Sequence, residues 1–323
     1  MKKRILLVSD VKGWGGWVRG QYIQKHLSDE FDIDLIDMDE FNIIEESIPK
    51  TYDLMYLLFH TMLVTQKVRR IISKIKTITI VTGFPTIKPI FRKRYQKVNY
   101  TTFHTHSKNC YAIGANNLIS LDDLKKNYNG RTFYTPRGVD PDVFYPMSKK
   151  PKKENEDLVV AYVGKPVPQK GLNDIIKPAC KIANCKLIIN DRNYTNALGP
   201  DDMRLFYNKA DVYLVASTID GTPNPAIEAA ACGKPIISNP IGNMPEFITN
   251  WENGFLIKQD MEDKNMIIQK YVYCLKRLKE NKQECFDMGM NARQEILNNW
   301  TWEKVTENER KIFREIFKWD IEK

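Results

Sequence analysis

Two lysines and two carboxylates stand where strands lead into helices, which is where α/β proteins place chemical groups. Lys165 and Lys170 lie in a short loop after the apolar run 158–163, and a helical pattern follows at once. About fifty residues later, Asp220 and Glu228 bracket a second such loop and the start of the next helical pattern. The N-terminus of a helix after a parallel strand is well suited to hold a diphosphate. The two lysines would stabilise the negative charge that accumulates on a departing nucleoside diphosphate.

The second loop combines a glycine with a carboxylate that can accept hydrogen bonds. Around Gly221, backbone N–H groups of residues 221–224 can come close to a phosphate. A carboxylate such as Asp220 can accept charge-assisted hydrogen bonds from sugar hydroxyls. Each loop taken alone also has a simpler interpretation. The lysines can be solvated surface residues, and Glu228 can be a first-turn residue that the helix dipole favours.

Four ordered segments within residues 158–257 resemble glycosyltransferase family 4. Asp220 and Glu228, separated by seven residues, look like the acidic signature of that family, in which Glu is usual at both ends. The loop 164–171 is similar to the family's Gly-Arg to Lys-Gly loop. The remaining two similar segments are 242–246 and 252–257.

Similarity to the same family is weaker outside this region. Residues 13–16 resemble its glycine-rich loop, in which Gly16 would let backbone approach the donor phosphate; an ordinary glycine turn is the alternative. Residues 136–140 resemble its inter-domain segment. Residues 300–303 resemble the start of its terminal helix, which in GT-B enzymes crosses back onto the first domain.

The resemblance implies a retaining glycosyltransferase that moves a hexose-type sugar from a nucleotide sugar, UDP- or GDP-linked, to an acceptor hydroxyl. It implies that no metal or other cofactor is required. In the implied mechanism, Lys165 and Lys170 stabilise the leaving diphosphate and Asp220 orients the donor sugar, while Glu228 holds the nucleotide ribose. The donor-binding residues that it implies are Gly15, Gly16, Gly164, Gly221, Thr222, Pro223, Asn224 and Glu228.

Three positions depart from the family pattern. Lys165 replaces the usual Arg, which keeps the charge and loses the planar bidentate fork. Asp220 is one methylene shorter than the usual Glu. Residues 82–85 read Thr-Gly-Phe-Pro where family members often place a sugar-contacting His.

The order of apolar runs predicts the fold that would position these residues. Short apolar runs alternate with amphipathic stretches, which predicts parallel strands joined by helices. The pattern restarts after a polar, proline-bearing stretch at 146–157. We therefore expect an α/β protein of GT-B type, with two Rossmann-like doubly wound domains facing across a cleft and the active site between them. The expected domains are an acceptor-binding domain, 1–148 with a crossing helix at 303–323, and a nucleotide-sugar domain, 149–302.

Composition restricts the partners and the compartment. The 323 residues include 49 Lys and Arg against 40 Asp and Glu, a net charge of +9 that favours anionic partners. A Lys-rich and Asn-rich composition that simply raises the pI is the alternative. The six cysteines form no Cys-x-x-Cys pair, which indicates a reducing compartment and hence the cytoplasm. No apolar run approaches the roughly 18 residues of a membrane-spanning helix, so only attachment to a membrane surface is left open.

A basic segment in the first half suggests where the acceptor binds. Arg92, Lys93 and Arg94 lie among aromatic residues, which suits an anionic or membrane-borne acceptor such as a lipid-linked or cell-surface glycan. Nucleic acid carrying modified bases is the second choice, and a solvated helix face is the alternative. His104 and His106 fit an acceptor-site loop better than a metal site, because no other metal ligand stands close by in sequence. The rival functions are a non-catalytic nucleotide-sugar binding protein and a sugar-nucleotide epimerase.

Overall fold

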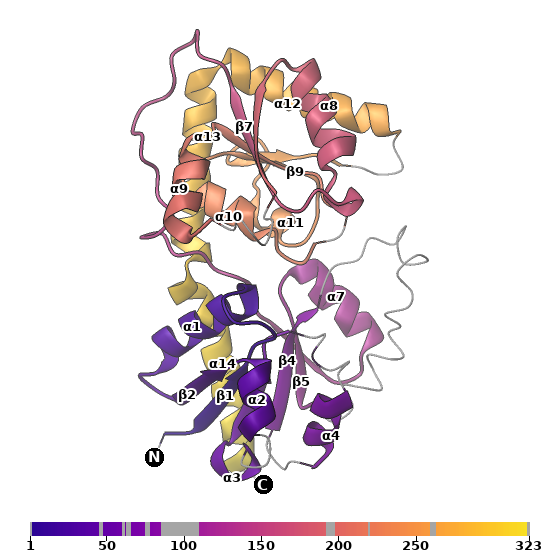
Figure 1. Cartoon of the computed structure of the whole chain (residues 1–323), viewed down its shortest axis with the longest axis vertical. Helices are drawn as coiled ribbons and strands as arrows, with labels where there is room; N and C mark the ends of the chain where they lie inside the picture. The colour runs from indigo at the N-terminus through magenta and orange to yellow at the C-terminus, as the bar shows by residue number, and fades with distance from the viewer. Residues whose placement is uncertain are drawn as a thin grey trace. The chain divides into compact units, whose positions relative to one another are not determined.

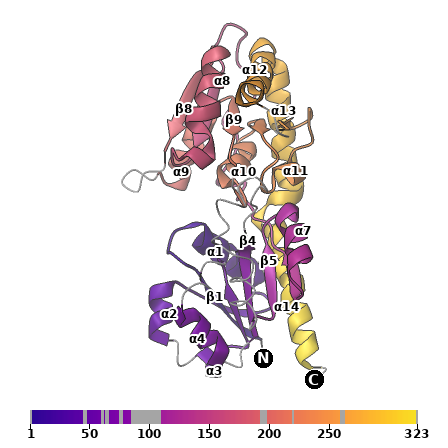
Figure 2. The same cartoon turned by 90° about the vertical axis from the view of Figure 1, so that its right-hand side faces the viewer.

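The computed structural model describes residues 2–44, 48–59, 62, 66–74, 78–84, 110–191, 198–218, 220–258 and 263–321. Contacts between Cα atoms divide the chain into two compact units, shown in Figures 1 and 2. The first unit comprises Met1–Gly138 with Trp302–Lys323, and the second comprises Val139–Thr301. Residues 139–148, which were expected in the first domain, belong to the second unit by their contacts. The guanidinium groups of Arg204 and Arg293 donate to the carbonyl oxygens of Val143 and Phe144.

The described part of the first unit contains a parallel sheet of six strands in the order β2-β1-β3-β4-β5-β6. The strands are β1 (Arg4–Val8), β2 (Asp32–Ile36), β3 (Leu54–Leu57), β4 (Ile78–Phe84), β5 (Ala112–Ala115) and β6 (Arg131–Tyr134). The helices are α1 (Gly15–Leu27), α2 (Met38–Ile44), α3 (Ile48–Thr51), α4 (Gln66–Lys74), α7 (Leu118–Asn127) and α14 (Trp302–Ile321). Successive residues of β1 enter different core clusters, Leu6 on one face and Ile5 with Leu7 on the other. The strand is a continuous apolar run because both faces are covered.

The C-terminal helix α14 returns to the first unit, as the sequence predicts. It packs against α1, and Phe313 enters the same core cluster as Ile5. Arg19 of α1 and Glu309 of α14 form a buried ion pair, and Arg19 also donates to the Asn116 side chain at 3.0 Å. An unpaired buried charge would be strongly unfavourable, so this pair fixes the helices in one register.

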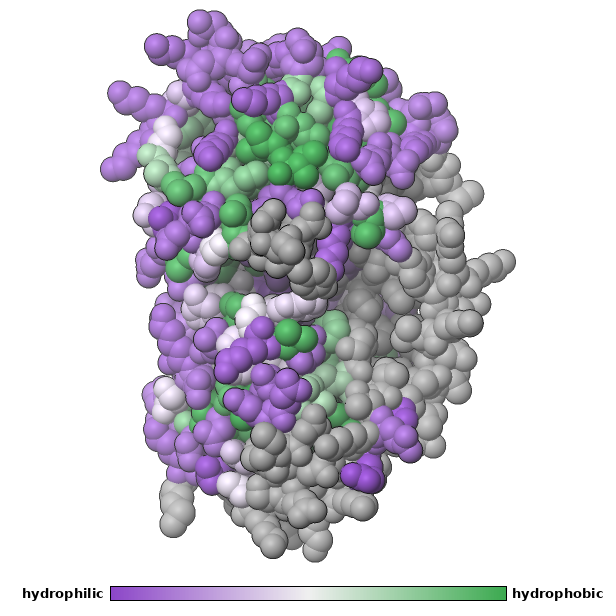
Figure 3. Space-filling view, in the orientation of Figure 1, coloured by the Kyte–Doolittle hydropathy of each residue, from purple (hydrophilic) through white to green (hydrophobic). Residues whose placement is uncertain are grey.

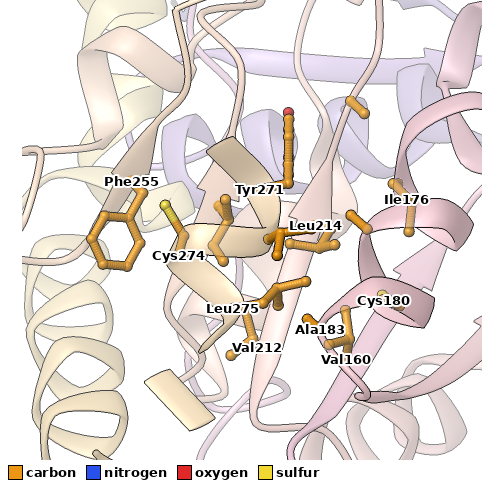
Figure 4. Close-up of a cluster of buried hydrophobic side chains, with 14 of the residues drawn as sticks. Val160, Ile176, Cys180, Ala183, Val212, Leu214, Phe255, Tyr271, Cys274 and Leu275 are labelled. Carbon is orange, nitrogen blue, oxygen red and sulfur yellow. The ribbon is translucent and has the colours of Figure 1, made fainter. Parts of the chain in front are cut away.

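The second unit repeats the architecture with a parallel sheet of five described strands in the order β11-β10-β9-β7-β8. These are β7 (Val159–Val163), β8 (Lys186–Asn190), β9 (Val212–Val215), β10 (Ile236–Ser238) and β11 (Gly254–Leu256). The helices are α8 (Lys177–Ile182), α9 (Pro200–Asn208), α10 (Asn224–Ala231), α11 (Met244–Phe247), α12 (Lys264–Glu280) and α13 (Lys282–Glu295). Figure 4 shows one of its core clusters, in which α12 contributes Tyr271, Cys274 and Leu275 beside Val160 and Leu214 of the sheet. The predicted two-domain α/β fold is thus confirmed.

Two helical segments of the second unit contain a π turn. Residues 172–182 begin with a π turn, Leu172–Ile176, before α8. The carbonyl oxygen of Gly171 accepts hydrogen bonds from both Ile175 and Ile176, and Pro178 has no N–H with which to continue an α-helical pattern there. Helix α13 likewise ends at Glu295, and a π turn, Ile296–Trp300, follows it.

Polar and apolar groups are unevenly distributed over the described surface. Hydrophilic residues cover most of the face shown in Figure 3, and a group of apolar residues lies among them on the second unit. Large apolar side chains that stay exposed in that unit include Ile182, Ile189 and Leu205. Within the described ranges, no helix combines the length and apolarity that crossing a membrane requires.

Candidate functional site

The first functional loop follows β7 and comprises residues 164–171, here called the lysine loop. It leaves the strand at Gly164, whose φ of +151° is rare for residues with a side chain, and forms a 3₁₀ turn at Pro168–Lys170. Gly171 closes the loop in the left-handed conformation, with φ of +68°. A Cβ atom at Gly171 would lie 2.5 Å from the carbonyl oxygen of Ala216. Both glycines are therefore required by the backbone geometry.

The second functional loop, residues 216–224, follows β9 and is here called the acidic loop. The N–H group of Thr218 donates to the carbonyl oxygen of Gln169 at 2.8 Å, which attaches the acidic loop to the lysine loop. A third segment supports it, since Gly242 approaches so closely that a Cβ atom there would lie 2.5 Å from the carbonyl oxygen of Gly221. The loops that follow β7, β9 and β10 thus converge at the carboxyl edge of this sheet, where such folds bind ligands.

The convergence brings two of the predicted catalytic residues together. The ammonium group of Lys170 lies 2.6 Å from a carboxylate oxygen of Asp220, and the two side chains are 33% and 13% exposed. Lys165, by contrast, is exposed at the outer part of its loop. A lysine ammonium group has three donors, so Lys170 can keep Asp220 as a partner and still donate to a phosphate.

Tyr162 of β7 lies close enough to Asp220 of this ion pair to interact with its charge. Because it looks like an ordinary strand residue in the sequence, it was not predicted to belong to the site. Its hydroxyl group donates to the carbonyl oxygen of Lys165 at 3.3 Å, so it supports the lysine loop from β7. Burial, with a contribution from the charge of Asp220, raises the pKa of Tyr162 to about 12. The hydroxyl therefore remains a protonated donor across the physiological range.

Several buried polar groups around the acidic loop have no hydrogen-bond partner among the described residues. They are the Thr222 hydroxyl, the Oδ1 atoms of Asn224 and Asn239, and both amide atoms of Asn243. Asn243 is fully buried and belongs to the segment after β10. A buried polar group without a partner is costly, and such groups commonly mark a ligand or ordered water. The predictions included Thr222 and Asn224 but missed Asn239 and Asn243, although the signature segment 242–246 pointed to the latter.

The backbone of the acidic loop offers fewer donors than its sequence suggests. Pro223 has no N–H group, and the N–H group of Asn224 donates to the carbonyl oxygen of Thr222 at 2.8 Å. In this conformation neither residue can donate a backbone hydrogen bond to a phosphate.

Glu228 is oriented by a residue outside the signature. The hydroxyl group of Tyr207, a fully buried residue of α9, donates to a carboxylate oxygen of Glu228 at 2.6 Å. Glu228 itself is partly exposed on α10. The hydrogen bond fixes one carboxylate oxygen, so the other can be directed toward a ligand.

The glycine-rich loop of the first unit lies between β1 and α1. Gly15 begins α1, and its carbonyl oxygen accepts a hydrogen bond of 2.7 Å from the guanidinium group of Arg137, which is only 8% exposed. Gly16 is buried, and a Cβ atom there would lie 3.0 Å from the Ser9 hydroxyl oxygen and 3.1 Å from an Asp10 carboxylate oxygen. The close packing of α1 on the end of β1 accounts for this glycine. Its role toward a phosphate stays a prediction.

The predicted acceptor residues Arg92, Lys93, Arg94, His104 and His106 lie outside the described residues, as does Pro85. In the stretch where a sugar-contacting His was expected, residues 82–84 belong to β4. No group of three His, Cys, Asp or Glu side chains arranged to hold a metal ion occurs in the described ranges.

Comparison with known proteins supports the interpretation of the second unit. Residues 186–295 match the model of the family "Glycosyl transferases group 1". The chain is 26% identical over 214 residues to an uncharacterised glycosyltransferase of Methanocaldococcus jannaschii, covering 60% of this chain and 57% of that protein. It is 24% identical over 178 residues to the capsular polysaccharide biosynthesis glycosyltransferase CapM of Staphylococcus aureus, covering 47% and 45%. These matches thus span about half the length of those relatives.

Solved structures extend the likeness to the whole chain. A sucrose-phosphate synthase of Thermosynechococcus elongatus superposes with a TM-score of 0.73 at 14% identity, covering 98% of this chain and 99% of that one. Anabaena HepE in complex with UDP and glucose gives 0.73 at 14% identity, covering 97% and 100%. At this identity the likeness shows the fold alone. The chain has the GT-B fold of two parallel-sheet α/β domains, and its residues 186–295 match the model of the group 1 glycosyl transferases.

Proposed function

We propose that this chain is a retaining glycosyltransferase that transfers a hexose-type sugar from a UDP- or GDP-sugar to an acceptor hydroxyl. The observation that carries the proposal is the ion pair of Lys170 and Asp220 at the carboxyl edge of the second sheet. In this pair, a cation that can bind a diphosphate lies beside a carboxylate that can accept hydrogen bonds from sugar hydroxyls. Glu228 lies one turn into the helix that follows Asp220. The buried Asn239 Oδ1 and the buried amide of Asn243, which have no hydrogen-bond partner in the described structure, provide further groups for a polar ligand.

The proposed reaction is a same-face displacement. The acceptor hydroxyl oxygen bonds to the anomeric carbon as the bond from that carbon to the diphosphate oxygen breaks. The departing phosphate oxygen takes the hydroxyl proton, so no strong protein base is needed. Lys170, with Lys165, stabilises the negative charge on the diphosphate as it develops. Asp220 orients the donor sugar, and Glu228 accepts a hydrogen bond from the ribose.

Two findings support a nucleotide-sugar donor. The family match covers the acidic signature, and solved structures with the same fold include HepE in complex with UDP-glucose. The proposed donor site also requires no metal, because Lys165 and Lys170 supply the positive charge. In the first unit, Gly15 and Gly16 are proposed to approach the donor phosphates.

A donor screen tests the proposal. The purified chain is incubated with UDP-, GDP- and ADP-sugars, and thermal stabilisation and nucleoside diphosphate release are measured with and without candidate acceptors. A transferase releases diphosphate in an acceptor-dependent manner. A changed sugar without release would identify an epimerase, and stabilisation without any turnover would identify a binding protein; either result would refute the proposal.

For the acceptor, we propose a lipid-linked or cell-surface glycan at a membrane surface facing the cytoplasm. The basic segment with Arg92, Lys93 and Arg94 supports this choice, because anionic headgroups attract such clusters. Reversing all three to Glu should abolish binding to anionic vesicles and leave donor hydrolysis unchanged. Binding of the unaltered chain to DNA but not to vesicles would favour a modified-base acceptor instead. Binding to neither at low salt would mean a soluble acceptor.

A further inference from the structure

A cavity of about 100 Å³ lies in the second unit, away from the candidate site. Leu158, Asp211 and Lys234, which line it, stand immediately before or near the start of β7, β9 and β10. The strands are parallel, so the cavity lies at the amino edge of the sheet. The lysine and acidic loops follow the opposite ends of the same strands. The cavity is therefore separate from the proposed donor site, and we call it the lysine cavity.

Positive charge dominates the lining of the lysine cavity. It contains four ammonium groups and one carboxylate, Asp211, which leaves a formal excess of three positive charges. The four lysines are Lys150, Lys152, Lys234 and Lys282. Two thiols also line it, and burial raises the pKa of Cys232 and of Cys285 to about 12, so both remain neutral.

The only carboxylate in this lining is already engaged. Asp211 accepts hydrogen bonds from the ammonium group of Lys152 at 2.9 Å and from the N–H group of Val159 at 2.7 Å. Lys152 is thereby neutralised, and Asp211 is fixed at the start of the sheet. Within the described residues, neither Lys234 nor Lys282 forms an ion pair with a carboxylate.

Lys282 is the strongest indication of a ligand. Its side chain is buried, with 3% of the residue exposed, and its ammonium nitrogen has no hydrogen-bond partner in the described structure. Burial of a charge without a partner costs far more than burial of a neutral polar group. Burial also lowers the pKa of Lys234 on the same lining. An anion in the cavity would offset the cost of burying both groups.

We propose that the lysine cavity binds a small phosphate-type oxyanion, either inorganic phosphate or a phosphate monoester. A cavity of about 10–15 Å³ is enough for a single water molecule. The lysine cavity, at about 100 Å³, therefore has room for a group of several heavy atoms but not for a nucleotide. The Lys282 and Lys234 ammonium groups donate charge-assisted hydrogen bonds to the oxygens. The proposal does not depend on the proposed glycosyl transfer.

Titration of the whole chain with inorganic phosphate tests this inference. Calorimetry and thermal unfolding are recorded at constant ionic strength, with sodium chloride as the reference and with no nucleotide sugar present. We expect saturable phosphate binding and a rise in Tm that chloride does not reproduce. Equal stabilisation by chloride would show charge screening only and would overturn the proposal. Glycerol 3-phosphate in a parallel titration distinguishes a monoester from free phosphate as the preferred ligand.

Matched variants assign the binding to the cavity. Lys282→Met removes the buried amine and should weaken phosphate binding at least about ten-fold, without loss of folding, because an apolar chain replaces an unpartnered charge. Lys276→Met, on the exposed face of α12 and outside the cavity lining, should leave phosphate binding unchanged.

Unaltered phosphate binding in Lys282→Met would refute the assignment to the cavity. If Lys282→Met does not fold, Lys234→Gln gives a second test. UDP should bind together with phosphate, whereas competition between them would place the phosphate in the donor site.

Discussion

At the scale of single residues, Lys170 connects the two functional loops through its ion pair with Asp220. Lys170→Ala should lower kcat by about 100-fold or more, because a cation directed at the leaving group contributes chiefly in the transition state. The fold should be retained, which circular dichroism checks. Lys177→Ala, an exposed lysine of α8, serves as the control and should keep normal turnover. Near-normal turnover of Lys170→Ala would remove this lysine from the mechanism.

Glu228 should act on binding more than on chemistry. Glu228→Gln keeps the shape of the side chain and loses the charge that strengthens a hydrogen bond from the ribose. We expect the donor KM to rise by about ten-fold while kcat changes little. Tyr207→Phe should shift KM in the same direction and by less, since it removes only the hydrogen bond that orients Glu228. An unchanged donor KM in Glu228→Gln would contradict the ribose assignment.

Much of the site could be predicted at this scale, but not all of it. Lys165, Lys170, Asp220 and Glu228 could be singled out from residue type and spacing, and their roles in the site stay predictions. Their pairing does not, because the contact of Lys170 with Asp220 depends on two loops that are fifty residues apart in sequence. Tyr162 and Tyr207 were missed because a tyrosine in an apolar strand or helix looks like a core residue until its hydroxyl partner is known.

At the scale of elements, the position of the lysine loop depends on Gly171. Gly171→Ala forces a side chain into a φ of +68° and places its Cβ atom 2.5 Å from the Ala216 carbonyl oxygen. We expect a loss of about 1–3 kcal/mol in the free energy of unfolding, together with a large fall in transfer activity as Lys170 is displaced. Urea unfolding and a turnover assay measure the two effects.

A second glycine provides the control for that experiment. Gly199 precedes α9 with a φ of −67°, and a Cβ atom there would meet nothing within 4 Å. Gly199→Ala should therefore be neutral or slightly stabilising. Equal effects of the two substitutions would show that the Gly171 geometry is not what the loop requires.

The apolar run 158–163 predicts the ends of β7, Val159–Val163, to within one residue. The helices were less predictable where the backbone is irregular. The π turn at Leu172–Ile176 arises because the Gly171 carbonyl accepts two N–H groups, which no local pattern of apolar residues reveals.

At the scale of the whole molecule, ion pairs attach α14 to the rest of the first unit. Hydrogen bonds from Arg314, and also from Arg310, hold the pKa of Glu30 below its ordinary value. Because that pKa is lower in the folded chain, the stabilisation is complete above about pH 5 and is lost as the pH falls through the folded-state pKa. Glu30→Gln should lower stability by about 0.5–1 kcal/mol near neutral pH, and this difference should be smaller at about pH 3, below the ordinary pKa of a Glu carboxyl.

Denaturant unfolding at the two pH values measures this difference. Glu315→Gln is a suitable control, because Glu315 is 73% exposed and lies 4.0 Å from its partner Arg131. It should change stability little at either pH. If Glu30→Gln were as stable as the unaltered chain near neutral pH, the ion pairs of α14 would contribute nothing measurable.

The return of α14 also determines how the second unit is joined to the chain. Val139 pairs with Thr301, and the Val139 N–H group donates to the Trp300 carbonyl oxygen at 2.9 Å, so the first and last residues of this unit are neighbours. A domain whose ends meet can be transplanted into a surface turn of an unrelated host, or closed head to tail and reopened elsewhere. Residues 139–301 thus behave topologically as an insertion, and the nucleotide affinity proposed for them can be measured after excision as a separate polypeptide.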